Sequence, residues 1–134
     1  MLKQLSIYAE NKKGALQVMT NALYEAGINI WGSVTNDGAE YGINRMVVSD
    51  PDKAKEVLTE RGYLCRFVDV LAVEIEDKPG ALNTLLTALL DSNVNVDYTY
   101  LSFNRDSSTP VMILHTADPE EVEICLRAKG FKMV

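Results

Sequence analysis

The sequence is one unit written twice, and this repeat limits the possible folds more than any other feature. When the chain is shifted by 66 positions, residues 5–10 align with residues 71–76, and residues 11–16 with residues 77–82, without a gap. A sequence that repeats at a fixed period builds the same small structure more than once. We therefore expect two copies of one supersecondary unit.

The repeat predicts two domains, residues 1–67 and residues 68–134. The offset grows from 66 to 68 by the point where Asp50 and Pro51 match Asp118 and Pro119, so the second copy gains two residues between Asn95 and Asp118. A unit of this size buries little apolar surface by itself. No Gly-, Ser- or Pro-rich linker separates the copies near residue 67. We therefore expect them to pack tightly as one continuous structural unit.

Within the first copy, the apolar spacing switches between strand and helix patterns. Residues 5–10 alternate as a half-buried strand does, and Leu16, Met19 and Leu23 then recur at helical spacing until Gly27 ends the helix. Strands follow near residues 28–34 and 42–48, with a hairpin turn at residues 36–38. A second helix begins at Asp50-Pro51 and ends at Gly62, and residues 64–76 form a long strand that joins the copies.

The second copy repeats this pattern, with helices predicted over residues 81–92 and 119–129 and strands near residues 94–103 and 110–116. The order β-α-β-β-α-β places both helices on one face of an antiparallel sheet. The sequence thus predicts an α+β fold of two tandem ferredoxin-like βαββαβ repeats.

Charge and composition exclude several kinds of partner. The chain is 47% hydrophobic and carries a formal net charge of −6, which argues against nucleic acids and anionic membranes because both attract positive surfaces. It has no apolar run of about 20 residues and no signal peptide, so we expect a cytoplasmic protein. Cys65 and Cys125 lie 60 positions apart without metal-ligand spacing, and are expected to be small buried hydrophobes. We expect no cofactor and no metal.

The turn between the first strand and the first helix of each copy is the strongest candidate binding site. The unpaired N–H groups and positive dipole end of a helix N-terminus attract a carboxylate or a phosphate. Gly14 and Gly80 lack a Cβ and let a ligand approach the backbone closely. Asn29 and Asn95 begin the second strand of each copy, and their amides can bond a ligand with both an ammonium and a carboxylate.

A structural interpretation of the same residues stays open on physical grounds alone. Asn11 and Asp77 are good helix N-caps, and Gly and Asn are common residues of turns and strand ends.

The motif Asp77-Lys78-Pro79-Gly80-Ala81-Leu82, followed by a helix and then Asn93-Val94-Asn95-Val96, resembles the ACT domain signature in two copies over nearly the whole chain. ACT domains are regulatory modules, often attached to enzymes of amino-acid biosynthesis, and many bind amino acids between paired domains. The resemblance implies that the turn and the start of the second strand contact the ligand. The residues concerned are Asn11, Lys12, Lys13, Gly14, Ala15, Leu16, Asn29 and Ile30 in the first copy, and Asp77, Lys78, Pro79, Gly80, Ala81, Leu82, Asn95 and Val96 in the second.

The first copy departs from this motif, because Asn11 replaces the usual Asp and Lys13 stands where Pro is expected. A lost carboxylate weakens contact with a ligand ammonium, so we expect the second copy to be the stronger site. The resemblance implies a free-standing regulatory protein that binds an amino acid and acts on a partner enzyme or through a homodimer. The alternative is an interaction subunit of an amino-acid biosynthetic enzyme that has lost ligand binding.

An enzyme on the same fold is a third possibility, but the sequence offers no catalytic set. His115 is the only histidine and lies in an alternating strand, where it is expected to be structural. Glu120, Glu121 and Glu123 open a helix, where acidic residues suit the dipole and usually face solvent. No nucleophile motif, zinc motif or phosphate-binding loop is present.

Overall fold

The structure is a computed structural model that describes residues 1–36 and 40–134. The chain divides into two compact units: a first unit, Lys3–Val68, and a second unit, Asp69–Val134 together with Met1–Leu2. The hairpin turn predicted at residues 36–38 lies outside the described residues except for Asn36, which ends a strand.

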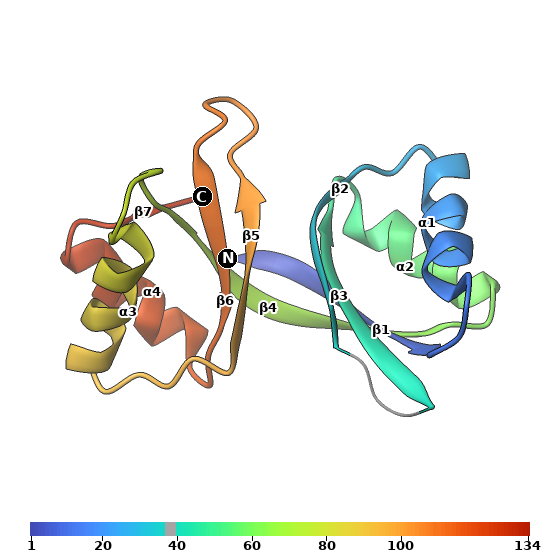
Figure 1. The fold of residues 1–134 in the computed structure, drawn as a ribbon, viewed down its shortest axis with the longest axis horizontal. Helices are drawn as coiled ribbons and strands as arrows, with labels where there is room; N and C mark the ends of the chain where they lie inside the picture. Colours follow the sequence, from blue (N-terminus) through green and yellow to red (C-terminus); the bar gives the residue numbers. More distant parts are fainter. Residues whose placement is uncertain (37–39) are drawn as a thin grey trace. The chain divides into compact units, whose positions relative to one another are not determined.

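The first unit has the predicted βαββαβ order. Its elements are β1 (Leu2–Glu10), α1 (Ala15–Glu25), β2 (Ile30–Asn36), β3 (Tyr41–Val48), α2 (Pro51–Glu60) and the beginning of β4 (Leu64–Glu74). β3 pairs antiparallel with both β2 and β1, and β4 lies next to β1. Figure 1 shows α1 and α2 together on one face of these strands.

The second unit repeats this arrangement. Its elements are the end of β4, α3 (Ala81–Asp91), β5 (Tyr98–Phe103), β6 (Pro110–His115), α4 (Pro119–Ala128) and the short β7 (Lys132–Met133). The strand order is β7-β4-β6-β5 with antiparallel pairing throughout, and both helices pack on one face (Figure 1). The ferredoxin-like α+β prediction is confirmed in both units, and β4 passes from one to the other without a linker.

Strand register locates the two extra residues of the second copy. Met46 pairs with Leu5 and Ser33 in the first unit. Leu114 pairs with Leu71 and Thr99 in the second. The offset is therefore still 66 on β5 and has become 68 on β6. The insertion lies in the hairpin that joins β5 to β6, where a loop tolerates added length better than a sheet does.

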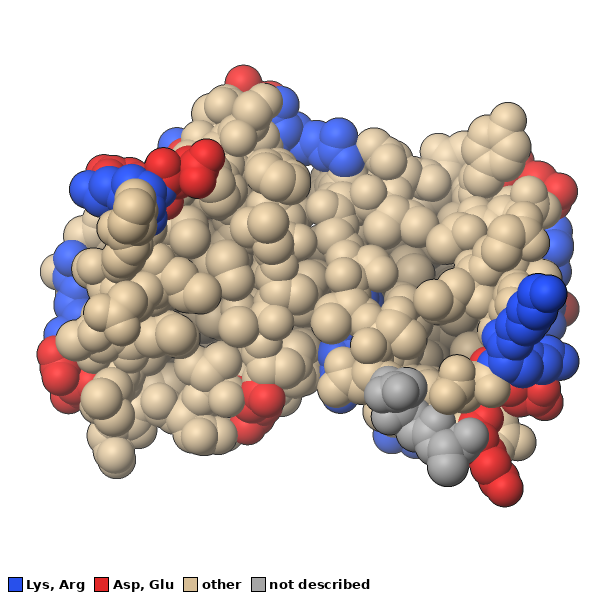
Figure 2. Space-filling model, in the orientation of Figure 1, with Lys and Arg blue, Asp and Glu red and all other residues tan. Residues whose placement is uncertain are grey.

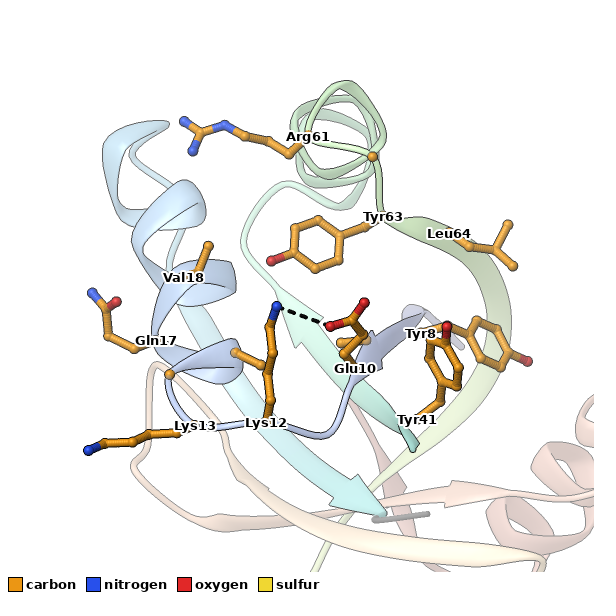
Figure 3. Close-up of a pocket in the computed structure, with 14 residues that line it drawn as sticks. Tyr8, Glu10, Lys12, Lys13, Gln17, Val18, Tyr41, Arg61, Tyr63 and Leu64 are labelled. Carbon is orange, nitrogen blue, oxygen red and sulfur yellow. Dashed lines mark ion pairs between the residues drawn. The ribbon is translucent and has the colours of Figure 1, made fainter. Parts of the chain in front are cut away.

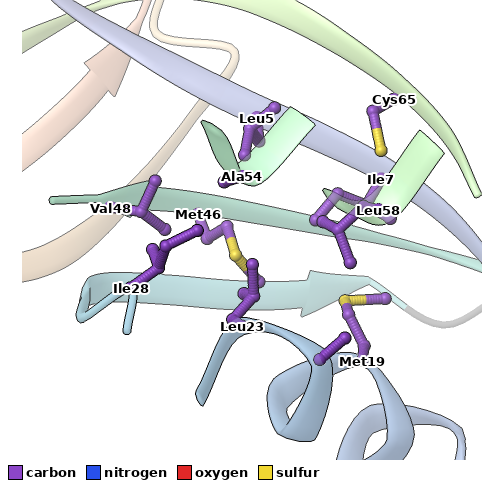
Figure 4. Packing of buried hydrophobic residues seen from close by; sticks show 11 residues of the cluster. Leu5, Ile7, Met19, Leu23, Ile28, Met46, Val48, Ala54, Leu58 and Cys65 are labelled. Carbon is purple, nitrogen blue, oxygen red and sulfur yellow. The ribbon is translucent and has the colours of Figure 1, made fainter. Parts of the chain in front are cut away.

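Each unit has its own apolar core between the helices and the sheet. In the first unit, Met19 and Leu23 of α1 and Leu58 of α2 pack on strand side chains that all point to one face (Figure 4). In the second unit, Leu85 and Leu89 of α3 hold the equivalent places. The paired leucines at positions 23 and 89 show that the repeat in the sequence is a repeat of the core.

Two local predictions need correction. The strand expected from residue 94 begins only at Tyr98, because the N–H of Val94 bonds to the O of Leu89 (2.9 Å) at the end of α3 and cannot join the sheet. Glu123 does not simply face solvent: it is half-buried and pairs with Arg127 at 3.0 Å and with the Met1 ammonium at 3.5 Å. These contacts, the hydrogen bond from Arg127 first, lower the pKa of Glu123.

No described helix is long and apolar enough to cross a membrane.

Candidate functional site

The strand-to-helix turns are nearly identical in the two units. Gly14 and Gly80 are the N-cap residues of α1 and α3, with φ of 84° and 86°, and no side chain caps either helix. The structural interpretation of Asn11 and Asp77 as N-caps is therefore wrong. A positive φ favours glycine at these positions. The first N–H of each helix, that of Ala15 or Ala81, donates to the carbonyl O of Lys12 or Lys78 at 3.2 Å. A helix that starts without a side-chain cap leaves the next N–H groups of its first turn for a ligand.

Two cavities flank the first-unit turn, one on each side. The larger, which we call the tyrosine cavity, has a volume of about 710 Å³ and lies toward the loop after α2. The smaller, the Asn44 cavity, has a volume of about 350 Å³ and lies toward β2 and β3. Gly14 and Ala15 line both cavities, so the start of α1 is accessible from two directions.

The tyrosine cavity combines aromatic rings with charges (Figure 3). Tyr8, Tyr41 and Tyr63 line it, together with an ion pair in which Lys12 Nζ lies 3.0 Å from Glu10 Oε2. Arg61 lies at its edge and pairs with Glu25 at 3.0 Å, which lowers the pKa of Glu25. Aromatic walls with a few polar groups are typical of small-molecule sites.

A smaller equivalent, of about 380 Å³, flanks the turn of the second unit. Its Glu76–Lys78 ion pair matches Glu10–Lys12. Where the first unit has Tyr8 and Leu64, however, the second has Glu74 and Lys132, whose charged atoms lie 3.2 Å apart. The hydrogen bond from Lys132 holds the pKa of Glu74 below its ordinary value. An ion pair internal to the protein thus replaces part of the tyrosine wall.

The Asn44 cavity contains an unsatisfied polar group. Asn44, on β3, is only 4% exposed, and its Nδ2 donates to Thr35 Oγ1 at 2.7 Å. Its Oδ1 is buried and has no hydrogen-bond partner among the described residues. An unpaired buried amide oxygen costs about 1–3 kcal/mol. A ligand that donates a hydrogen bond here would remove that cost.

The second unit has no such amide, because larger apolar residues occupy the equivalent positions. Ala9, Thr35, Gly42 and Asn44 of the first unit correspond to Ile75, Leu101, Pro110 and Met112 of the second. Met112 belongs to the apolar core, and Ile75 packs against it. The motif therefore predicts the second turn as the stronger site, whereas the cavities favour the first.

The structure brings most of the predicted first-unit turn residues together. Those lining one or both cavities are Asn11, Lys12, Lys13, Gly14, Ala15 and Leu16. In the second unit, only Lys78 and Ala81 line the cavity beside the turn. The other predicted turn residues of the second unit, Asp77, Pro79, Gly80 and Leu82, do not line the cavities beside the turns.

The predicted strand residues lie at the other end of each sheet. Ile30 pairs with Val48, whereas the turn follows Glu10, which pairs with Tyr41. The two pairs are seven positions apart along β3, or about 24 Å. Asn29 is next to Ile30, so neither lies near the turn of its own unit. In the second unit, Val96 packs against the core and Asn95 lines a separate cavity.

Sequence reasoning missed Asn44 and Thr35 because neither belongs to a motif. The available signal was the repeat itself: a position that is Met112 in one copy and Asn44 in the other exchanges a core hydrophobe for an amide.

Comparison with known families and structures identifies this architecture. Residues 1–133 match the family model described as an ACT domain pair. The chain belongs to the ACT domain family. The resemblance seen in the turn motifs is thereby confirmed.

Solved structures agree with this assignment. The protein BT0572 from Bacteroides thetaiotaomicron is 30% identical, with a TM-score of 0.90 over 99% of this chain and 91% of that one. The ligand-free regulatory subunit of aspartate kinase from Thermus thermophilus is 17% identical (TM-score 0.67, covering 96% and 91%). That from Thermus flavus is 20% identical (TM-score 0.61, with the same coverage). No curated protein matches the chain significantly.

At these lower identities the aspartate kinase subunits show the fold alone. Membership of the ACT domain family supports a ligand-binding regulatory role for this ACT domain pair, and points to a regulatory rather than a catalytic module.

Proposed function

We propose that this ACT domain pair binds an amino acid at the first-unit turn and passes that state to a partner enzyme or pathway. One observation carries the proposal: the start of α1 at Gly14 has no side-chain cap, and it borders the same cavity as Asn44 Oδ1, which has no hydrogen-bond partner among the described residues. Together they offer hydrogen-bond donors for an anion and an acceptor for a cation.

The two groups match the two ends of an amino acid. The ligand carboxylate accepts hydrogen bonds from N–H groups that follow Ala15 in the first turn of α1, where the helix dipole favours negative charge. The ligand ammonium donates to Asn44 Oδ1; Glu10, whose carboxylate pairs with Lys12, is among the residues that line the same cavity. The cavity volume of about 350 Å³ suits a small metabolite. The second-unit turn at Asp77 remains a predicted second site with the same uncapped helix start.

A thermal-shift panel of the twenty amino acids tests this function. A ligand at about 100 times its dissociation constant adds roughly 2.7 kcal/mol of stability. We expect one or a few amino acids to stabilise the protein selectively. Asn44→Met, which installs the residue found in the second unit, should abolish that shift, and Asp77→Ala should retain it.

Two results contradict the proposal in different ways. A shift lost in Asp77→Ala and retained in Asn44→Met places the ligand at the second turn. A flat panel at saturating concentrations favours the interaction subunit that binds no amino acid.

We further propose that regulation acts through a homodimer or an enzyme partner in the cytoplasm. Strand β5 is at the end of its strand order and exposes Leu101 (50%) and Phe103 (56%), and exposed apolar edge strands favour pairing with another chain. On the surface of each unit that Figure 2 shows, most side chains are uncharged. Light scattering during size-exclusion chromatography should report a dimer, and Phe103→Lys should shift it toward monomer.

A further inference from the structure

A separate cavity in the second unit lies between the end of α3 and the start of α4. Its volume is about 400 Å³, and its polar lining includes Ser92, Asn95, Asp97, Thr116, Asp118 and Glu121. Thr116 is 2% exposed, and its buried Oγ1 has no hydrogen-bond partner among the described residues. The cavity thus contains a buried hydroxyl that a ligand can satisfy.

The charge of this cavity is negative. Asp97, Asp118 and Glu121 line it, and none of the described lining residues is Lys or Arg. Asp118 is the N-cap residue of α4, yet its side chain makes no capping hydrogen bond. Asp50, at the same place in the first unit, accepts from the N–H of Lys53 at 3.1 Å. The carboxylate of Asp118 is therefore not engaged as its counterpart is.

The neighbours of Asp97 are fixed. Its Oδ2 lies 2.8 Å from His115 Nδ1, and its Oδ1 accepts from Asn95 Nδ2 at 3.1 Å. The ring of Tyr98 stacks on that of His115, with centroids 5.0 Å apart. These contacts hold the Asp97 carboxylate in place at the rim of the cavity.

In the first unit, a lysine ammonium of the protein itself occupies the equivalent place. There, Lys53 Nζ donates to the O of Ala26 at the end of α1, at 2.8 Å. Ala26 and Lys53 correspond to Ser92 and Glu121 of the second unit, and Val48 corresponds to Thr116. A helix C-terminus attracts cations, and the first unit supplies its own. In the second unit an acceptor replaces that ammonium, since an ionised Glu donates no hydrogen bond.

We infer that the cavity between α3 and α4 binds an organic primary amine, whose ammonium takes the place that Lys53 Nζ holds in the first unit. Carbonyl groups at the end of α3 and the carboxylates of Glu121 and Asp118 surround the ammonium, and Thr116 Oγ1 accepts from it or from a neighbouring ligand group. A metal ion fits less well, because no cluster of three or more ligating side chains among the described residues could hold one. This site is separate from the proposed amino-acid site of the first unit.

The test is a titration of the full chain with the diamine putrescine, followed by amide chemical shifts in NMR. The matched neutral control is butanediol, which replaces each ammonium by a hydroxyl on the same chain. We expect saturable shifts at Ser92, Thr116 and Ala117 with putrescine and none with butanediol. Equal shifts with both compounds, no saturable shift with putrescine, or Mg²⁺ saturating the same amides at lower concentration would overturn the inference.

Two variants and one control sharpen the test. Glu121→Lys copies Lys53, and its own ammonium should occupy the site and weaken putrescine binding by about tenfold or more. Glu120→Lys makes the same charge change on a residue outside the cavity lining and should alter binding by less than about twofold. Thr116→Val copies Val48 and should weaken binding by about threefold. An equal loss in both lysine variants, or full binding in Glu121→Lys, contradicts a defined site.

Discussion

The two units share a backbone plan but leave different places open. In the first unit, the end of the sheet beside the turn holds the Asn44 cavity, and Val48 and Lys53 occupy the opposite end. In the second, Met112 fills the place equivalent to Asn44, and the opposite end holds the cavity lined by Thr116 and Glu121. The units are thus complementary in what they fill and what they leave open.

Comparing the two units distinguishes residues that determine the fold from residues that border candidate ligand sites. Positions that are apolar in both copies, such as Leu23 and Leu89, form the cores. Positions that are apolar in one copy and polar in the other, such as Met112 and Asn44, have a structural role in one unit and border a cavity in the other. In a repeat protein, each candidate site in one unit can therefore be compared with the equivalent positions of the other unit.

The largest effect should come from the cores, where the units should behave alike. Leu23→Ala and Leu89→Ala each remove a buried leucine, and each should destabilise its own unit by about 3 kcal/mol. Urea denaturation monitored by circular dichroism measures both. If the free energy of unfolding fell by less than about 1 kcal/mol in one variant alone, the two cores would not be equivalent.

Residues 44 and 112 are equivalent, and giving each unit the residue of the other should change stability in opposite directions. Met112→Asn places an amide in an apolar core and should destabilise the protein by about 2–3 kcal/mol. Asn44→Met removes a buried amide oxygen that has no partner among the described residues, and should be neutral or stabilising by up to about 1 kcal/mol. The same denaturation assay compares them, and a strong destabilisation by Asn44→Met would show that the amide oxygen has a partner in solution.

Substituting the glycine at the strand-to-helix turn should lower stability equally in the two units. Gly14→Ala and Gly80→Ala each place a side chain at positive φ, where nothing lies within 4 Å of the added Cβ. The cost is therefore conformational, about 1 kcal/mol in each unit. A much larger loss in thermal unfolding experiments for one variant alone would show that the two turns differ.

The smallest effect concerns the ion pair that distinguishes the cavities beside the turns. Lys132→Met should raise the pKa of Glu74 toward its ordinary value, because the hydrogen bond from Lys132 is the main cause of its lowering. In the wild type, ionised Glu74 stabilises the fold above the ordinary glutamate pKa, and this stabilisation is lost as the pH falls through the lowered pKa. Carboxyl NMR titration measures the shift, and an unchanged pKa would contradict the pairing.

The sequence predicted the fold well because its determinants are periodic and local. The spacing of Leu16, Met19 and Leu23 and the Asp50-Pro51 helix start each act within a few turns of chain, and the repeat shows the same local signals twice. The late start of β5 was missed because the helix-capping bond of Val94 competes with strand pairing.

The candidate site was only partly predictable. The turn motifs identified Gly14 and its neighbours, but the side chain opposite the helix start, Asn44, comes from β3 and meets the turn only through sheet register. Asn29 was grouped with the turn from the family pattern, yet the register places it at the far end of the sheet.

The most direct test of the account is amide chemical-shift mapping of the full chain with the amino acid that the thermal panel selects. We expect saturable shifts at Gly14, Ala15 and Asn44, and their loss in Asn44→Met. Shifts confined to Asp77 and Gly80, and unchanged by Asn44→Met, would contradict it and assign the ligand to the second turn.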